Sequence, residues 1–340
     1  MANISTRQTD VILNTKVTIA RNLEGYKFPV KLDANGKQEV IAIVEDALNK
    51  SDIKFNRVEI KIDKTNDELY SRGITSRHLY YGDPNVALFI SASKDLSVLV
   101  NDGEHIKISC VSDGIDTASC FEKANNLAAF IENNLGIAYV ESLGFLTSNI
   151  ERIGLALNIS YLAIIPGLVD KNGIVALSNT FEENYCKLTP IEPKNKDNPL
   201  YVLETKATLG IDEATLVKMA DNLVQQFAVR ERRARCEFVK GGEEMVEKYI
   251  NEYCCQFGML KYGTLFSRAR IIDASSIFYI VQSAHPMEGE LNLTWEQLSS
   301  MVRECIMSIL GFGSDEMDVI ECQRTIAKRV KRIIGVDLKE

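Results

Sequence analysis

Three groups capable of acid–base chemistry lie within four consecutive residues of this chain. Asp102, Glu104 and His105 surround Gly103 in the sequence NDGEH. Carboxylates and an imidazole can hold a substrate or move a proton, and binding groups are often found where the strands of a rigid sheet end. A solvated turn is the alternative for such a cluster taken alone. The cluster is a candidate site whose meaning depends on the elements around it.

The segment that contains this cluster predicts an antiparallel meander. Three short apolar runs at Val86–Ile90, Leu96–Val100 and Ile106–Val111 have the length and composition of strands. Two polar connections, SASKD and NDGE, join them at lengths that suit hairpins. The charged cluster therefore lies at the end of the second predicted hairpin.

Apolar spacing predicts the elements that flank the meander. Alternation indicates strands within 10–29, at Arg57–Ile62 and at Tyr201–Thr205, and residues 170–200 are turn-rich with some strand character. Helical spacing indicates helices at 37–50, 116–135, 213–240, 243–257, 274–284, 294–310 and 315–334. The basic string RERRAR at 230–235 is expected to be a solvated helix face.

This order of elements predicts an α+β fold with two domains. Residues 1–240 are expected to form an antiparallel sheet flanked by helices, and residues 241–340 an all-helical domain with a candidate dimerisation surface. The pair Gly241–Gly242 is the best boundary between them.

Composition narrows the class of protein. The chain has 340 residues, 46% of them hydrophobic, and a formal net charge of -8. This charge argues against sequence-independent binding of nucleic acid, and no apolar run is long enough to cross a membrane. Eight cysteines show no CxxC pair and no zinc spacing, so we expect reduced thiols in a cytoplasmic protein and no protein-bound metal.

Seven strings in order resemble the phosphagen kinases (ATP:guanido phosphotransferases), and among these the bacterial protein-arginine kinases. They are VILNTKVTIARNLEGYKFP at 11–29, SRHL at 76–79, VNDGEHIKI at 100–108, LGFLTS at 143–148, IGLALNIS with IPGLV at 153–169, LETKATLG at 203–210 and RERRAR at 230–235. The resemblance implies the phosphagen-kinase fold and transfer of the ATP γ-phosphoryl to a guanidinium. Such transfer needs Mg²⁺ and several arginines around the phosphates, and carboxylates that orient the acceptor.

The resemblance also implies which positions would hold ATP. The positions that match the family's phosphate-binding arginines, and its adenine-side histidine, are Lys16, Thr18, Lys107, Asn158, Lys187 and His78. Lysine keeps the charge of arginine but loses its two-pronged geometry, whereas threonine and asparagine remove the charge.

The acceptor side departs further from the family pattern. The expected guanidinium-orienting base falls on Gly103, with Asp102 and Glu104 on either side, and the second carboxylate falls on Glu192. Asn149 stands at the position of the reactive cysteine. The family's phosphoarginine-sensing motif, R-D-x-x-R, is absent from this sequence. Arg324 and Arg329 lie near its place, but the aspartate is missing.

Three hypotheses follow. The first is a catalytically impaired or inactive relative that keeps the fold, regulates or scaffolds a protein partner, and binds ATP and Mg²⁺ where nucleotide binding is retained. The second is an active kinase of arginine-containing proteins or of guanidino compounds, with lysines on the phosphates and Asp102, Glu104 or Glu192 on the acceptor. The third is a nucleotide-independent adaptor whose helical half assembles a homodimer.

Overall fold

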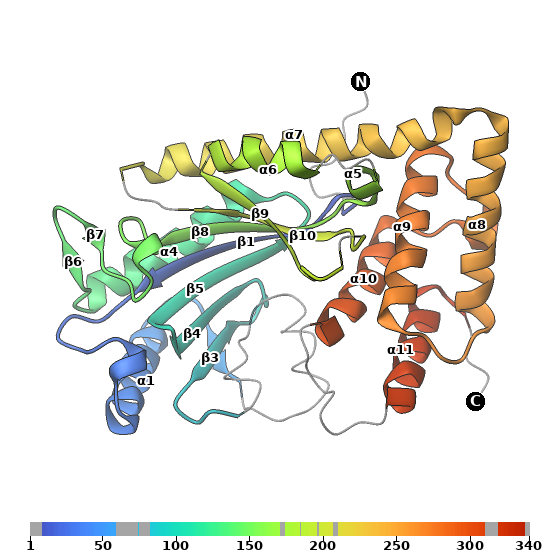
Figure 1. The fold of residues 1–340 in the computed structure, drawn as a ribbon. Helices are drawn as coiled ribbons and strands as arrows, with labels where there is room; N and C mark the ends of the chain where they lie inside the picture. Colours follow the sequence, from blue (N-terminus) through green and yellow to red (C-terminus); the bar gives the residue numbers. More distant parts are fainter. Residues whose placement is uncertain are drawn as a thin grey trace.

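The protein combines one large sheet with two groups of helices, shown as a computed structural model in Figure 1. The structure describes residues 9–58, 74, 82–170, 174–183, 185–195, 197–206, 210–309 and 319–336. Helices cover one face of the sheet, and a separate helical group lies beyond one end of it (Figure 1).

In the part of the chain that the structure describes, eight strands form the sheet, in the spatial order β2-β3-β4-β5-β1-β8-β10-β9, and every neighbouring pair is antiparallel. Their bounds are β1 Ile12–Arg21, β2 Phe55–Arg57, β3 Ala87–Ser91, β4 Leu96–Asp102, β5 Glu104–Asp113, β8 Leu157–Ile164, β9 Cys186–Pro190 and β10 Leu200–Thr205. A small hairpin of β6 (Tyr139–Val140) and β7 (Gly144–Phe145) projects from the main sheet (Figure 1).

The two faces of the sheet differ because side chains alternate along each strand. In the central strand β1, Val17 and Ile19 are buried, whereas Lys16 and Thr18, which alternate with them, are only partly covered. The apolar set faces the helices α1 (Ala34–Asn49), α4 (Thr117–Asn134), α6 (Ile174–Glu183) and α7 (Glu213–Phe238), which contribute to the same core. The opposite face, which carries Lys16 and Thr18, is the one on which a site can form.

Helix α1 illustrates how the sequence positions these layers. The Asp33 carboxylate accepts a hydrogen bond from the Gly36 amide at 2.8 Å, which caps the helix start. Residues Val40, Ile41 and Val44 are buried on one stripe that packs against the sheet. Capping and amphipathic spacing together place this helix under β4.

The C-terminal helices form a second core. It is built from α8 (Glu243–Tyr262), α9 (Arg268–Ala284), α10 (Trp295–Ile309) and α11 (Val319–Ile333), with the short α5 (Pro166–Asp170) packed against α9. Three residues of the sheet, Leu13, Ile164 and Leu200, belong to the same apolar cluster. The helical group is therefore packed directly against the end of the sheet.

A buried ion pair on α7 joins the two parts. Arg235 and Glu231 are both 0% exposed; the Arg235 guanidinium donates to Glu231 at 2.5 Å and to the carbonyl oxygens of Asp10 and Ile164. Arg232 also bonds the Asp10 carboxylate. The expectation of a solvated RERRAR face holds for Arg230 and Arg233, which are exposed, and is wrong for Arg232 and Arg235, which bond groups where the sheet meets the helices.

Most elements were predicted correctly. The α+β class and the antiparallel sheet are confirmed, as are the meander and the long helices, with ends moved by a few residues. Helix α6 at Ile174–Glu183 was missed, because residues 170–200 had been interpreted as turns and strand. Of the strand predicted at Arg57–Ile62, only Arg57 belongs to the observed strand β2, and Val58 follows it outside the strand. Residues 59–62 lie outside the described residues.

Candidate functional site

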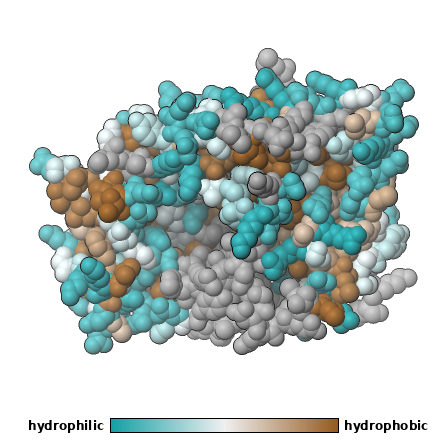
Figure 2. All heavy atoms as spheres, viewed as in Figure 1, coloured by the Kyte–Doolittle hydropathy of each residue, from teal (hydrophilic) through white to brown (hydrophobic). Residues whose placement is uncertain are grey.

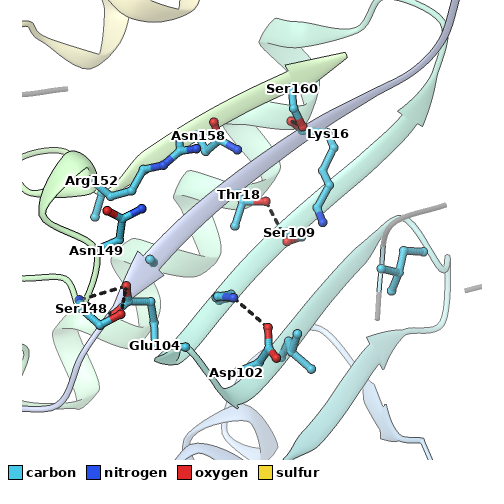
Figure 3. Close-up of a pocket in the computed structure, with 16 residues that line it drawn as sticks. Lys16, Thr18, Asp102, Glu104, Ser109, Ser148, Asn149, Arg152, Asn158 and Ser160 are labelled. Atoms are coloured by element: carbon cyan, nitrogen blue, oxygen red, sulfur yellow. Dashed lines mark hydrogen bonds and ion pairs between the residues drawn. The ribbon is translucent and has the colours of Figure 1, made fainter. Parts of the chain in front are cut away.

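A cavity of about 390 Å³ opens on the face of the sheet away from the main core (Figure 3). Charged, hydroxyl and amide side chains form much of its wall, and they come from β1, β4, β5, β8 and the segment that follows β7. The residues that line it are Lys16, Thr18, Ala20, Ile74, Leu99, Asp102, Gly103, Glu104, Lys107, Ser109, Ser148, Asn149, Arg152, Ala156, Asn158 and Ser160.

Strand register sets the floor of this cavity. Thr18 on β1 lies opposite Ser109 of β5 on one side and Asn158 of β8 on the other. The Thr18 and Ser109 hydroxyls are 3.0 Å apart and hydrogen-bonded. Lys16, two residues along β1 on the same face, lies opposite Ser160. Hydroxyls, an amide and an ammonium are thus gathered from three adjacent strands.

Two lysines bring positive charge to the floor. Burial lowers the pKa of Lys16 to about 8; the neighbouring charge of Lys107 also lowers it, and Asp102 opposes both. The Lys107 ammonium bonds the Asp102 carboxylate at 2.8 Å. Because an anionic ligand would stabilise the charged form of Lys16, such a floor favours phosphate or carboxylate ligands.

The turn between β4 and β5 is tighter than the sequence indicated. Asp102 and Glu104 are paired across it, and only Gly103 separates the two strands. Asn101 and Gly103 have left-handed backbones, with φ of 61° and 79°. The Asn101 amide also donates to the carbonyl oxygens of Lys37 and Asn85, which holds the turn against α1. The two acidic residues are therefore rigidly placed at the cavity rim.

Gly103→Ala is expected to lower the free energy of unfolding by about 1–2 kcal/mol, because a side chain disfavours the left-handed backbone. The nearest atom to an added Cβ is Lys107 Nζ at 3.5 Å, so the cost comes from the backbone and not from a clash. Urea denaturation measures it. The control Gly258→Ala, inside α8 with open space around it, should raise stability by about 1 kcal/mol. A change of the same sign in both variants would contradict this reasoning.

Glu104 is only 5% exposed and is already used by the protein. Its carboxylate accepts hydrogen bonds from the Asn22 side-chain amide at 2.6 Å and from the Ser148 hydroxyl at 2.8 Å. The Ser148 backbone N–H donates to both of its oxygens, at 3.0 and 2.9 Å. Glu104 therefore holds Ser148, in the segment that follows β7, against the sheet, as Figure 3 shows.

His105 also has a structural environment. It is 0% exposed, and its Nδ1 accepts a hydrogen bond from the Leu23 backbone N–H at 3.1 Å. That bond leaves the proton on Nε2, which lies 2.9 Å from the Lys27 carbonyl oxygen. Burial lowers the pKa of His105, which favours this neutral ring. These contacts are those of an ordinary hydrogen-bonded histidine beside the sheet.

Arg152 is a cavity residue that the sequence analysis did not select. It ends the short 3-10 turn η2 (Ile150–Arg152), and Figure 3 shows its guanidinium directed towards Asn158. It donates to the Thr205 carbonyl at 3.3 Å and to the Glu204 carboxylate at 3.2 Å. The only sequence signal was a lone arginine in the loop before a strand, and no spacing rule singles out such a residue.

Of the nine predicted site residues, the cavity brings six together: Lys16, Thr18, Asp102, Glu104, Lys107 and Asn158. Lys187 does not line the cavity. It lies opposite Glu204 in the strand register, on the same face of the sheet as Lys16 and Ser160. Glu192 lies outside the lining as well, and accepts a hydrogen bond from Asn198 at 2.9 Å. His78 lies outside the described residues.

The described residues contain no group of three or more His, Cys, Asp or Glu side chains arranged to hold a metal ion. Among their helices, none is both long and apolar enough to span a membrane.

Comparisons with known proteins place this geometry in context. Residues 37–234 match the family model described as ATP:guanido phosphotransferase, C-terminal catalytic domain. A protein-arginine kinase of Clostridium novyi (strain NT) is 25% identical over 288 residues, which cover 83% of this chain and 81% of that protein. A second protein-arginine kinase, from Geobacillus stearothermophilus, is 26% identical over 257 residues, 72% of this chain and 70% of that protein.

A solved structure shares the fold. The duplicated taurocyamine kinase from Schistosoma mansoni, with bound transition state analog components, superposes with a TM-score of 0.58 at 19% identity. The superposition covers 71% of this chain and 36% of that chain, so this chain spans about a third of the duplicated protein. At this level of identity the similarity concerns the fold alone.

Proposed function

Because this chain belongs to the ATP:guanido phosphotransferase family, we propose that it binds the phosphates of a nucleotide in the cavity but transfers a phosphoryl group weakly or not at all. Its role would then lie in regulating or scaffolding a protein partner. The relatives named protein-arginine kinases make an arginine-containing protein the natural partner class.

One observation carries this proposal: among the described residues that line the cavity, the two carboxylates, Asp102 and Glu104, are both already bonded to protein groups. Glu104 has both oxygens bonded to Asn22 and Ser148, and Asp102 is paired with Lys107. Gly103, between them, has no side chain. Misplacing or deleting a catalytic acid–base group typically costs a factor of about 10²–10⁴ in rate. The acceptor half of the site is therefore the impaired half.

The phosphate half has a suitable donor set. Lys16, Lys107 and Arg152 supply positive charge, and Thr18 and Ser109 supply hydroxyls on the same wall. Charged N–H donors and hydroxyls are the usual partners of phosphate oxygens. Mg²⁺ generally binds through substrate phosphates with few protein ligands, so the lack of a protein metal cluster in the described part is compatible with ATP arriving with its own Mg²⁺.

Isothermal titration calorimetry with ATP, with and without Mg²⁺, tests the phosphate half. The expected result is saturable binding that Lys107→Ala weakens, because that change removes a cation from the cavity. Absence of heat and of ATP-induced thermal stabilisation in the wild-type protein would contradict the proposal.

An active kinase is the second candidate, favoured by the cations that the cavity retains. In that case Lys16, Lys107 and Lys187 would bind the phosphates, and Asp102, Glu104 or Glu192 the acceptor. Lys107→Ala and Glu192→Ala should then each abolish turnover of ATP with an arginine-containing protein. Turnover that survives Glu192→Ala would exclude the proposed role of that residue, which agrees with its position outside the cavity lining.

A nucleotide-independent adaptor is the third candidate. An exposed apolar surface favours it: Tyr139, Val140 and Leu143 are 55%, 40% and 43% exposed, and Figure 2 shows hydrophobic atoms over the β6–β7 hairpin.

The division into a catalytic-type domain at 1–240 and a helical, dimer-forming domain at 241–340 also remains a proposal. Light scattering of the full chain tests the dimer, and a monomer at micromolar concentration would count against it.

A further inference from the structure

We propose that Arg152 is a phosphate ligand of the cavity and supplies the guanidinium contact that position 158 lacks. The sequence resemblance places an arginine where this chain has Asn158, so one positive charge is missing from the strand face. Arg152 reaches the same cavity from η2 instead. This inference rests on the proposed function, since it assigns a residue to the same ligand.

The backbone that carries Arg152 is fixed in place. Asn149 caps η2 by accepting a hydrogen bond from the Glu151 N–H at 3.1 Å, and the Thr147 hydroxyl donates to the Asn149 carbonyl at 2.8 Å. Just before the turn, Ser148 is bonded to the buried Glu104 carboxylate. The turn therefore presents Arg152 from a rigid base, which reduces the entropy that a ligand contact would cost.

The Arg152 guanidinium and the Asn158 amide are adjacent. Both contact Thr205: its carbonyl oxygen accepts from Arg152 Nη1 at 3.3 Å, and its hydroxyl donates to Asn158 Oδ1 at 3.4 Å. Figure 3 shows the two side chains next to each other on the cavity wall. The Arg152 guanidinium, held by Thr205, can thus bind a ligand in the place where an arginine at position 158 would have bound it.

The guanidinium also retains capacity for a ligand. Its bonds to Thr205 and Glu204 are 3.3 and 3.2 Å long, whereas charge-assisted bonds of this type are usually about 2.7–2.9 Å. These two bonds occupy two of its five N–H groups. The side chains of Arg152 and Glu204 are 23% and 29% exposed, so the ion pair is open to solvent. Such a pair contributes little to stability, and a phosphate can share the charge.

The test compares Arg152→Gln with Arg57→Gln. Arg57 lies on the edge strand β2 and forms a surface ion pair with Glu45 of α1, so its substitution is a matched loss of charge away from the cavity. The probes are ATP and inorganic triphosphate, measured by calorimetry. Arg152→Gln should weaken both by about ten- to a hundredfold, since a hydrogen bond to a charged group contributes about 1.5–3 kcal/mol. Arg57→Gln should bind within about twofold of the wild type, the range expected of a surface change.

Asn158→Arg in the Arg152→Gln background shows whether Arg152 binds the ligand or only stabilises the fold. If Arg152 binds phosphate, the new guanidinium should recover at least part of the lost affinity, and the melting temperatures of the wild type and Arg152→Gln should match. Unchanged affinity in Arg152→Gln, an equal loss in Arg57→Gln, or no recovery in the double variant would overturn the inference. If the wild-type protein does not bind ATP, both the proposed function and this inference fail. If the wild type binds ATP and Arg152→Gln binds it equally well, this inference fails and the proposed function stands.

Discussion

Glu231→Ala is expected to lower the free energy of unfolding by about 3–5 kcal/mol, because it leaves the buried Arg235 charge without its partner. Both side chains of the pair are 0% exposed. The Glu231 carboxylate also accepts the backbone N–H groups of Gly167 and Leu168, each at 2.9 Å. The substitution removes all of these acceptors at the junction between the sheet and the helical group.

Urea denaturation followed by circular dichroism measures this loss. Glu247→Ala, an exposed glutamate on α8, is the matched control and should change stability by less than about 0.5 kcal/mol. If Glu231→Ala unfolds within about 1 kcal/mol of the wild type, the ion pair does not hold the junction.

Lys16→Met is expected to reduce ATP affinity by about ten- to a hundredfold at pH 7, because it removes a charged donor from the cavity floor. The effect should depend on pH. Lys16 has a pKa lowered to about 8, so the wild-type lysine is charged at pH 7 and becomes neutral as the pH rises through that value. Wild-type affinity should therefore fall above pH 8, whereas the affinity of the methionine variant should show no such fall.

Stability should change in the opposite direction. In the unfolded chain Lys16 keeps its ordinary pKa, so between about pH 8 and pH 10 the unfolded state binds more protons than the folded state. Wild-type stability then gains from Lys16 as the pH rises, and Lys16→Met should remove that slope and raise stability at pH 7. Lys50→Met, which removes an exposed lysine paired with Asp46, is the control. Parallel pH profiles in the wild type and Lys16→Met would contradict the assignment.

The sheet could be predicted because its pattern is local. Alternation along β1 and the polar connections of the meander are properties of neighbouring residues, and the structure confirms both. Helix α6 could not be recognised in the same way. It has only ten residues, and its described apolar contacts with the core include Ile174, Leu177 and Phe181, a stripe of about two turns that is short for a helical pattern.

The site was predictable to the extent that strand register and motif strings define it. Lys16, Thr18 and Asn158 come together because β1 and β8 are neighbours in the sheet. Arg152 depends on how a loop folds back onto β10, and Glu192 depends on the path of the chain between β9 and β10. Neither path is visible in residue spacing, so the sequence did not select Arg152 and gave no sign that Glu192 would lie outside the cavity lining.

Phosphoryl transfer is the most direct test of the central claim, that the phosphate half of the site is retained and the acceptor half is not. The measurement is ³¹P nuclear magnetic resonance of the wild-type protein with ATP, Mg²⁺ and an arginine-rich protein, with a protein-arginine kinase relative run in parallel. Binding of ATP without phosphoarginine, under conditions where the relative forms it readily, is the predicted result. Phosphoarginine formation at a rate close to that of the relative would contradict the claim.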